Sequence, residues 1–405
     1  MEKNLGLYIH IPFCVSKCAY CDFLSFPINE KSKQTDTASW HVVAQYVEAL
    51  LKEIESYQRK EYKSYHVNTI FVGGGTPSIL ASEEVQRIFR ALYKNFTIDK
   101  EAEISLEVNP GTVTREKVEA WKAVGINRLS IGLQSTNNEE LKVLGRAHTF
   151  QQFQETFEMI QRAGFTNVNI DLISGIPGQT LEGFSMTLEE IGKYNPKHIS
   201  TYSLMIEEGT VFGDLYGDRL IGEVASQKKP LSLPTEEVDW EMYKRTEEVL
   251  TSFGYQRYEI SNYAKDGLVC KHNTRYWERE EYLGIGLGAA SLIGNIRFRN
   301  IRDMEMYLER VQRNESVRED EETETLTLKE QMDEFVFLGL RQIKGVSKAK
   351  FYQCFGEDME VMYKVPISKL MKENLLIIEG DNVRLTKRGI DLSNAVFVEF
   401  ISCRT

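Results

Sequence analysis

Strand-like and helix-like segments alternate along the first half of the chain. Short apolar runs rich in β-branched residues indicate strands, and the longer segments between them carry apolar residues at helical spacing. The strands are predicted over residues 5–12, 69–75, 104–110, 128–135, 167–177 and 198–206. The helices are predicted over residues 45–57, 82–96, 114–124, 138–145, 150–164 and 180–194. Helices of this length connect parallel strands, so the pattern predicts an α/β fold.

The polar motifs of this half lie, almost without exception, at the C-terminal ends of the predicted strands. Six strand–helix units fit a doubly wound sheet and also a partial (β/α)6 barrel, and periodicity does not choose between them. Both architectures build their active sites at that edge of the sheet. The pattern therefore predicts where the site lies, although it does not choose between the doubly wound sheet and the partial barrel.

The pattern changes in the second half of the chain. Residues 207–235 are irregular, 236–253 are predicted to be helical, and 255–300 contain short β-like runs with many glycines. The acidic stretch from Glu319 to Glu324 is expected to be a linker. We therefore divide the chain into a barrel over 1–210, an α+β extension over 211–318 and a C-terminal domain over 326–405.

The C-terminal domain is predicted to be a winged-helix-like module. Its helices are expected over residues 328–343, 347–355 and 366–373, and a hairpin turning at Gly380 follows them. Between residues 326 and 405 there are twelve Lys or Arg and eleven Asp or Glu, a net charge of +1. Packing or partner binding is therefore favoured over DNA binding.

Composition indicates a globular protein without a membrane span. Hydrophobic residues make up 42% of the chain, in runs too short to cross a bilayer. The formal net charge of −11 argues against a general nucleic-acid-binding surface. The N-terminal MEKNLGLYIHIPF lacks the pattern of a signal peptide. We expect a cytoplasmic protein that is not integral to a membrane and does not bind nucleic acid.

Three cysteines, Cys14, Cys18 and Cys21, lie within eight residues directly after the first predicted strand. Such spacing lets one loop present three thiolates to an iron–sulfur cluster. Three ligands on a four-iron cube leave one iron open to an amine and a carboxylate. The alternative is structural zinc, which needs four closed ligands, and the nearby His10 lies on the strand. We therefore predict a [4Fe–4S] cluster.

The C-x₃-C-x₂-C spacing, with Tyr20 before the last cysteine, resembles the signature of the radical S-adenosylmethionine (SAM) superfamily. The surrounding IHIPFCVSKCAYCDF is similar to the branch that holds oxygen-independent coproporphyrinogen oxidases and HemW-type haem chaperones. The resemblance implies a partial (β/α)6 barrel. It also implies that SAM binds the open iron and is cleaved to a 5′-deoxyadenosyl radical, while the protein positions the reactants and excludes water.

The resemblance further implies a SAM pocket built from strand ends. Glycines after the second strand let the backbone approach a ligand closely, and the family uses this segment against the methionine amino group. The expected contacts there are Gly74, Gly75 and Thr76. Glu107 and Gln134 end the third and fourth strands. In the family's pattern four residues match contacts to the methionine carboxylate, the sulfonium region and the ribose: Glu107, Gln134, Arg146 and Asp171.

The fork of donors on Arg146 suits a carboxylate, and Asp171 can accept from both ribose hydroxyls. Tyr8 and Tyr20 resemble residues that flank the cluster and the adenine. Aromatic residues in such places are also often core residues.

Two departures separate the chain from the oxidases of this branch. Those enzymes carry a further cysteine two positions after the third ligand, where this sequence has Phe23. They also carry a longer segment before the first cysteine. Both departures favour the chaperones.

The segment CKHNTRYW, from Cys270 to Trp277, resembles the HNxxYW signature of HemW-type chaperones, which is implicated in haem attachment. Histidine is a common haem ligand, so His272 is the expected haem contact, and Tyr276 and Trp277 offer flat apolar surface. The glycine-rich residues 282–291 are expected to line a broad pocket. The alternatives are a structural histidine beside two packed aromatic residues, or ligation by Cys270.

We therefore expect a haem chaperone that binds haem, a [4Fe–4S] cluster and SAM and delivers haem to haem proteins, membrane-bound cytochromes among them. A cofactor-dependent homodimer is also expected. The alternative is an oxygen-independent coproporphyrinogen III dehydrogenase, which performs radical SAM oxidative decarboxylation in haem biosynthesis. Radical chemistry and a structural or redox role for the cluster are both consistent with these residues.

Overall fold

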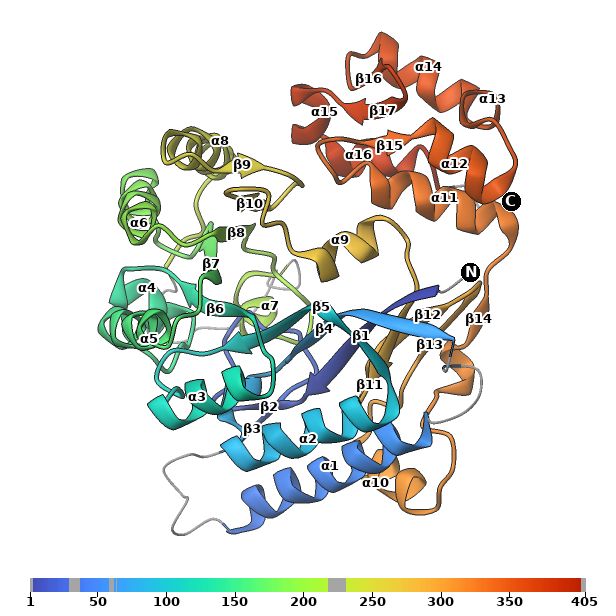
Figure 1. Cartoon of the computed structure of the whole chain (residues 1–405). Coiled ribbons are helices and arrows are strands. Elements are labelled where there is room, and N and C mark those ends of the chain that lie inside the picture. The colour runs from blue at the N-terminus through green and yellow to red at the C-terminus, as the bar shows by residue number, and fades with distance from the viewer. Residues whose placement is uncertain (1–2, 29–36, 58–61, 63, 218–230, 402–405) are drawn as a thin grey trace.

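The computed structural model describes residues 3–28, 37–57, 62, 64–217 and 231–401 (Figure 1). Within these residues a 12-stranded sheet forms the body of the molecule, in the order β14-β13-β12-β11-β1-β4-β5-β6-β7-β8-β10-β9. Six of its strands are parallel and follow one another in the sequence. They are β1 (Lys3–Ile11), β4 (Tyr65–Gly74), β5 (Thr97–Val108), β6 (Arg128–Gln134), β7 (Asn167–Ser174) and β8 (His198–Ser203). The predicted partial (β/α)6 barrel is confirmed.

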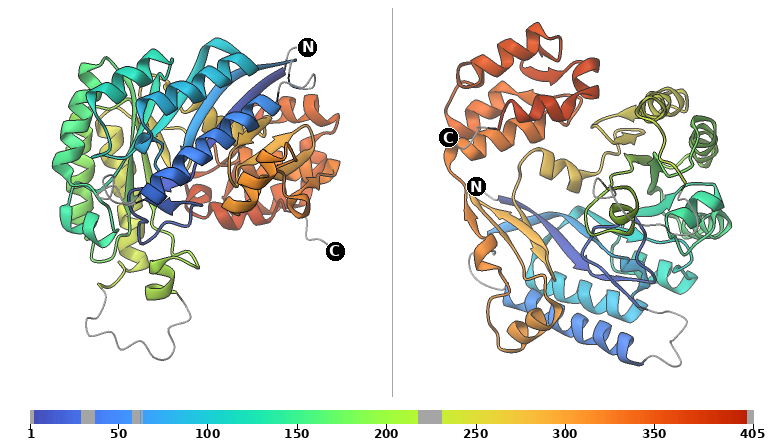
Figure 2. Two further views of the ribbon diagram at one scale, coloured as in Figure 1. Left: turned by 90° about the horizontal axis from the view of Figure 1, so that it is seen from below. Right: turned by 180° about the vertical axis from the view of Figure 1, so that it is seen from behind.

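The connecting helices cover the outer side of the curved sheet (Figures 1 and 2). In chain order they are α1 (Thr37–Ser56), α2 (Ser82–Asn95), α3 (Arg115–Ala123), α4 (Asn138–Val143), α5 (Phe150–Arg162) and α6 (Leu181–Tyr194). In α2 the buried residues Val85, Ile88, Phe89 and Leu92 recur at helical spacing. In β1 the alternate residues Leu5, Leu7, Ile9 and Ile11 are fully buried, and the side chains of Tyr8 and His10 therefore point to the opposite face.

The segment after the barrel extends the same sheet at both edges. On one edge β11 (Tyr282–Ile285) runs parallel to β1 and is followed by β12 (Ala290–Ile293), β13 (Ile296–Arg299) and β14 (Glu324–Thr325). On the other edge β10 (Asn262–Ala264) pairs with β8, and β9 (Gln256–Arg257) pairs with β10. Met242 and Tyr263 belong to the same hydrophobic core as the barrel. The region expected over 211–318 is thus continuous with the barrel in both sheet and core.

Two stretches of this region contain more regular structure than was predicted. The acidic stretch expected to be a linker forms a 3-10 turn, η4 (Asp320–Glu322), and the edge strand β14. The segment expected to be irregular contains α7 (Val211–Tyr216) and ends just before α8 (Glu236–Ser252). Its residues 218–230 lie outside the described part of the chain. Two further helices, α9 (Lys271–Trp277) and α10 (Met304–Gln312), were not predicted.

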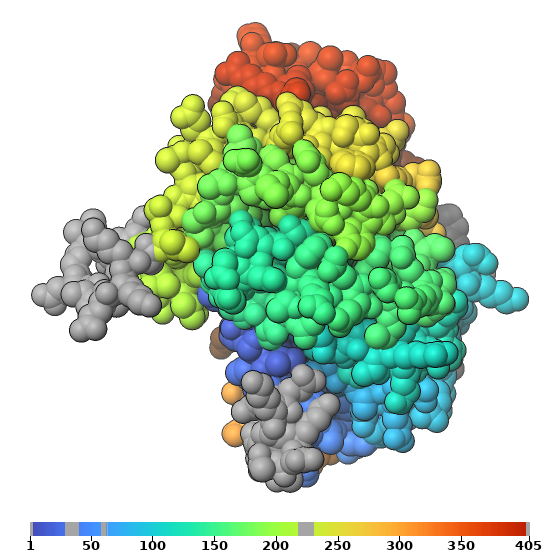
Figure 3. Space-filling model, turned by 90° about the vertical axis from the view of Figure 1, so that its left-hand side faces the viewer, coloured from blue at the N-terminus to red at the C-terminus, as the bar shows by residue number. Residues whose placement is uncertain are grey.

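The C-terminal module has a hydrophobic core of its own and lies at one end of the molecule (Figure 3, red). A three-stranded sheet in the order β15-β17-β16 packs with its helices. The elements are α11 (Leu328–Gly339), β15 (Val346–Ser347), α12 (Lys348–Phe355), α13 (Met359–Met362), α14 (Lys364–Lys372), β16 (Leu376–Glu379), β17 (Asn382–Leu385), α15 (Lys387–Asp391) and α16 (Ser393–Val398). The predicted helices and hairpin are present, and α13, α15 and α16 add to them.

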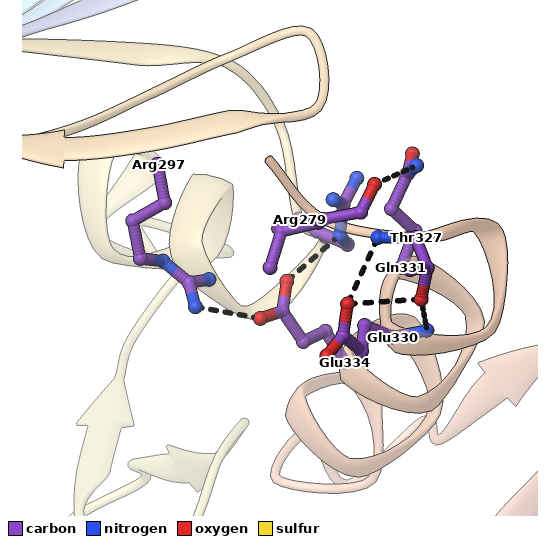
Figure 4. A network of polar contacts seen from close by, with 7 residues as sticks. Arg279, Arg297, Thr327, Glu330, Gln331 and Glu334 are labelled. Carbon is purple, nitrogen blue, oxygen red and sulfur yellow. Dashed lines mark hydrogen bonds and ion pairs between the residues drawn. The ribbon is translucent and has the colours of Figure 1, made fainter. Parts of the chain in front are cut away.

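Ion pairs join the C-terminal module to the rest of the chain. Glu334 on α11 pairs with two arginines (Figure 4). Its Oε2 lies 3.0 Å from Nε of Arg279, which follows α9, and its Oε1 lies 2.7 Å from Nη1 of Arg297 on β13. The Arg341 guanidinium stacks 4.4 Å above the ring of Trp277. The helix that carries the HNxxYW residues is therefore held between the barrel and this module. Among the described helices, none combines the length and the apolar character that a membrane span needs.

Candidate functional site

A pocket of about 480 Å³ lies at the C-terminal ends of the parallel strands. Residues from each of the six strands, or from the loop directly after it, line its walls. The sequence-predicted residues that it brings together are Cys14, Cys18, Tyr20, Cys21, Gly74, Gly75, Thr76, Glu107, Gln134, Arg146 and Asp171. The predicted residues that do not line it are Tyr8 and His272.

The cysteine loop is held in place from two sides. Ala19 donates its backbone N–H to the carbonyl of Leu144, and its own carbonyl accepts from the N–H of Phe212. The Tyr20 ring packs against a small buried cluster that contains Leu144 and Phe212. These contacts fix the loop without using the thiols, so all three sulfur atoms are left for a ligand.

The thiols themselves are adjacent to hydrogen-bond donors. Thr76 Oγ1 lies 3.5 Å from Cys14 Sγ, and Arg146 Nη1 lies 3.6 Å from Cys18 Sγ. Burial raises the pKa of the Cys21 thiol to about 11 and also raises that of Cys14. Without a metal the Cys14 and Cys21 thiols stay protonated at neutral pH, and iron would displace the protons by supplying positive charge. Donors aimed at the sulfur atoms fit a thiolate-ligated cluster.

Glycine is required at Gly74 and Gly75, where β4 ends beside the cysteine loop. A Cβ on Gly75 would lie 2.6 Å from the backbone oxygen of Phe13. Gly74 has a φ of 113°, and a Cβ there would lie 2.5 Å from the ring of His10. The backbone of this segment therefore borders the pocket directly, which suits close approach of a ligand.

Arg146 is anchored at three points on one wall of the pocket. Its Nη2 donates to the carbonyl of Gly132 at 2.6 Å and to Asn109 Oδ1 at 3.1 Å, while Nη1 faces Cys18. His148 Nδ1 lies 3.0 Å from the same Asn109 oxygen. The buried Nε of Arg146 has no hydrogen-bond partner among the described residues. A fixed guanidinium with an unused donor suits an anionic group such as a carboxylate.

Two carboxyl groups line the same pocket from β5 and β7, the strands on either side of β6. Glu107 Oε2 accepts from the backbone N–H of Gly74 at 3.0 Å, and burial together with the charge of Asp171 raises the pKa of Glu107 to about 8. Asp171 accepts from Asn169 Nδ2 at 2.8 Å and from Ser130 Oγ at 3.1 Å. Burial also raises the pKa of Asp171. Two poorly solvated carboxyl groups favour a cationic ligand, which would stabilise their ionised forms.

Gln134 ends β6 in the left-handed region, with a φ of 75°. The pairing of β6 with β7 shifts register between Gly132 and Gln134, as at a β-bulge. A non-glycine residue in this conformation is strained, and such strain is common at functional sites. The irregularity places Gln134 on the pocket wall.

His272 lies outside this pocket, at the start of α9, and its side chain is completely buried. Its Nδ1 is 3.0 Å from Thr69 Oγ1, and its Nε2 is 2.8 Å from the hydroxyl of Tyr276. Burial and the charge of Arg275 lower the pKa of His272 to about 3, so the ring is neutral. Both ring nitrogens are therefore occupied in this conformation.

The residues around His272 border smaller cavities. His272, Tyr276 and Tyr8 line a cavity of about 170 Å³ on the inner face of the barrel. Trp277 borders a different cavity, of about 230 Å³, against the C-terminal module. Cys270 is completely buried, its thiol donates to Glu103, and burial raises its pKa to about 12.

The residues of the main pocket that were missed in the sequence include Asn109, Ser130 and Tyr202. Asn109 and Tyr202 lie close to strand ends, which is the signal that identified Glu107 and Gln134. Ser130 lies within β6, and an isolated serine in a strand carries no comparable signal.

Comparison with known proteins agrees with this geometry. The model of the radical SAM superfamily matches residues 8–191, and the model of the HemN C-terminal domain matches residues 326–392. A relative from Lactococcus lactis named heme chaperone HemW is 33% identical, and the match covers 99% of this chain and 98% of the relative. The chain belongs to the HemW family of radical SAM proteins. A second HemW, from Bacillus subtilis, is 33% identical over 97% of this chain and 98% of its own.

The fold of this HemW-type chain also resembles that of a solved structure. Coproporphyrinogen III oxidase (HemN) from Escherichia coli, described as a radical SAM enzyme, superposes with a TM-score of 0.82. The match covers 98% of this chain and 90% of the oxidase at 24% identity, so the likeness concerns the fold alone. Membership of the radical SAM superfamily implies a [4Fe–4S] cluster and SAM, and the donor set of the pocket fits both.

Proposed function

We propose that this chain is a haem chaperone that binds a [4Fe–4S] cluster, SAM and haem, and delivers haem to haem proteins. The observation that carries the proposal is the similarity, over nearly the whole chain, to relatives named heme chaperone HemW. Phe23, at the position where the oxidases of the branch have a further cysteine, also supports it.

In this proposal Cys14, Cys18 and Cys21 hold the cluster through three of its irons. When bound, the cluster supplies an electron that can cleave the sulfonium bond of SAM. The chain's own residues bind and orient SAM through charge. The Arg146 guanidinium interacts with the methionine carboxylate, and Glu107 accepts from the methionine amine.

The remaining pocket residues complete the SAM site. Asp171 accepts from the ribose hydroxyls, and Gln134 contacts the sulfonium region. The backbone at Gly74, Gly75 and Thr76 borders the methionine end of the ligand, and Tyr20 flanks the cluster. Tyr8 lies beyond the main pocket, so we assign it to the cavities beside that pocket.

We infer that His272 contacts haem only after α9 moves. A neutral imidazole is the form that ligates iron, and the low pKa of His272 keeps it neutral. The hydroxyl of Tyr276 must first leave Nε2. Because Arg341 stacks on Trp277 and Glu334 pairs with Arg279, displacement of α9 is coupled to the C-terminal module.

We further propose a cytoplasmic protein whose recipients include membrane-bound cytochromes and which binds no nucleic acid. The C-terminal module, with a net charge of +1 over residues 326–405, then serves for contact with a protein partner. A homodimer that binds the cofactors more tightly than the monomer would be stabilised by them through mass action.

Haem titration followed at the Soret band tests the proposal. Wild type should bind one haem per chain and pass it to an apo-haem protein, and His272→Ala should weaken the complex. The triple Cys14/Cys18/Cys21→Ala variant should lose iron and sulfide but keep haem. Turnover of coproporphyrinogen III by wild type without a stable haem complex would contradict the proposal and favour the dehydrogenase.

A further inference from the structure

A second pocket lies beside the main one and meets the strands that extend the sheet. Its volume is about 370 Å³, within the range of ~300–1,000 Å³ that is typical of small-molecule sites. It shares Asp22, Phe23, Gly74 and Glu107 with the main pocket, so the two are contiguous. It contains the predicted cofactor contacts Tyr8, Gly74 and Glu107 and the predicted haem neighbour Tyr276. Three residues of the glycine-rich segment 282–291, which was expected to line a broad pocket, also border it, and the two arginines of its outer part have no role in the functions above.

Aromatic rings form much of this second pocket. Tyr276 and Tyr282 pack edge to face, with ring centroids 4.7 Å apart and planes at 88°. Tyr8 contributes a third ring, which stacks on Phe71. Phe23, at the boundary with the main pocket, is 61% exposed. Such walls suit a flat apolar ring system that is only partly enclosed.

Two arginines border the same pocket from the end of β13 and the loop after it. Arg299 Nη1 lies 3.2 Å from Glu322 Oε2, and both side chains are partly exposed. Arg302 is exposed and makes no ion pair with any residue of the described ranges. In a chain with a net charge of −11, two arginines on an aromatic pocket indicate an anionic ligand, and guanidinium groups bind carboxylates well.

We propose that the second pocket binds the carboxylate-bearing edge of a porphyrin macrocycle, with Arg299 and Arg302 on its carboxylates and Tyr276 and Tyr282 against its ring. This inference rests on the haem-binding function proposed above and names where the ligand docks. Haem combines a flat apolar ring with two carboxylate side chains, which is the combination that these walls and cations complement.

The position of Tyr276 gives this site a defined relation to His272. The Tyr276 ring borders both the second pocket and the inner cavity, and its hydroxyl is bonded to His272 Nε2. A macrocycle in the second pocket therefore contacts Tyr276 without any movement of α9. Docking at this pocket and ligation by His272 are separate steps, and variants can distinguish them.

Glu322 competes with the ligand in this arrangement. Its carboxylate occupies Arg299, so a bound macrocycle must displace it. Removal of the Glu322 charge should strengthen binding, while removal of either arginine should weaken it. Opposite effects at two neighbouring positions are not expected from general loss of structure.

The test uses the full chain, reconstituted with iron, and three probes: haem, protoporphyrin IX and the dimethyl ester of haem. Wild type should bind haem and protoporphyrin at least tenfold more tightly than the ester, since a hydrogen bond to a charged group is worth ~1.5–3 kcal/mol. Arg299→Gln and Arg302→Gln should each weaken haem binding about tenfold without changing ester binding. Glu322→Gln should tighten haem binding severalfold.

Arg313→Gln is the matched control, because Arg313 is an exposed arginine at the end of α10 that pairs only with Glu309 among the described residues. It should bind all three probes like wild type. Circular dichroism and iron content establish that each variant is folded. Equal affinities for haem and its ester, or arginine variants that bind haem like wild type, would overturn the docking site while the haem-binding function stands. A wild type that binds no haem would overturn both.

Discussion

Replacement of Glu107 by glutamine should stabilise the iron-free protein, although Glu107 belongs to the proposed SAM site. Its carboxyl group accepts from the backbone N–H of Gly74, and a glutamine side-chain oxygen can accept the same hydrogen bond. Burial and the nearby charge of Asp171 disfavour the ionised form and raise the pKa to about 8. Glutamine is neutral at every pH and avoids this cost.

The size of the effect follows from the two pKa values. The folded pKa of about 8 lies above the ordinary value of 4.5, so the folded state holds a proton that the unfolded state has lost at neutral pH. The stability that protonated Glu107 contributes to the folded state is fully present below about pH 4.5 and is lost as the pH rises to about 8. At pH 7 the shift of the Glu107 pKa corresponds to a loss of roughly 3 kcal/mol in the free energy of unfolding, at 1.36 kcal/mol per pKa unit. Solvent screening in the open pocket reduces this loss to about 2 kcal/mol.

The assay is urea unfolding of the iron-free protein at pH 4.5 and pH 7, with Glu119→Gln as a control on the exposed face of α3. Glu107→Gln should match wild type at pH 4.5 and exceed it by about 2 kcal/mol at pH 7. The control should differ from wild type by less than about 0.5 kcal/mol at either pH. A variant that is less stable than wild type at pH 7, or whose stability equals that of wild type at both pH values, would refute the reasoning.

Three further substitutions test other contacts of the structure. Arg146→Lys should weaken SAM binding, measured by calorimetry, about tenfold, because an ammonium group cannot make the three directed contacts of the guanidinium. Unchanged affinity would contradict the assignment of Arg146 to the SAM site. Glu53→Ala should lower the free energy of unfolding in urea by ~3–5 kcal/mol, because the buried carboxyl accepts from four donors, Tyr307 at 2.6 Å among them. A loss below about 1 kcal/mol would contradict this structural role of Glu53. Glu334→Gln should speed hydrogen exchange across α11 by releasing two arginines, and unaltered exchange would show that those ion pairs do not hold the module.

The barrel could be predicted from the sequence because each of its units is local. Strands with alternating or continuous apolar residues and amphipathic helices between them carry their own periodicity. The main pocket could be predicted for the same reason, since strand ends of a parallel sheet meet at one edge and the polar residues fall there. Tyr8 follows the same alternation in β1 and does point inward, but the adjacent strands decide which cavity it borders.

The rest depends on contacts between distant parts of the chain. Pairing of β11 with β1 joins residues 276 positions apart, such as Gly6 and Tyr282. Short strands such as β9 and β14 carry too few residues for a pattern. The surroundings of His272 are set in the same way, because its partner Thr69 lies on β4. The local structure of the acidic stretch near Glu322 was not predicted, since the pairing of β14 with β13 has no signature in its composition.

The measurement that tests the central claim most directly is electron paramagnetic resonance of the anaerobically reconstituted and reduced protein, with and without SAM. The claim is that three thiols on one loop hold a [4Fe–4S] cluster whose open iron faces the wall of Glu107 and Arg146. The account predicts about four irons per chain and a spectrum that changes when SAM is added. Iron absent after reconstitution, or a cluster signal that SAM leaves unchanged, would contradict it.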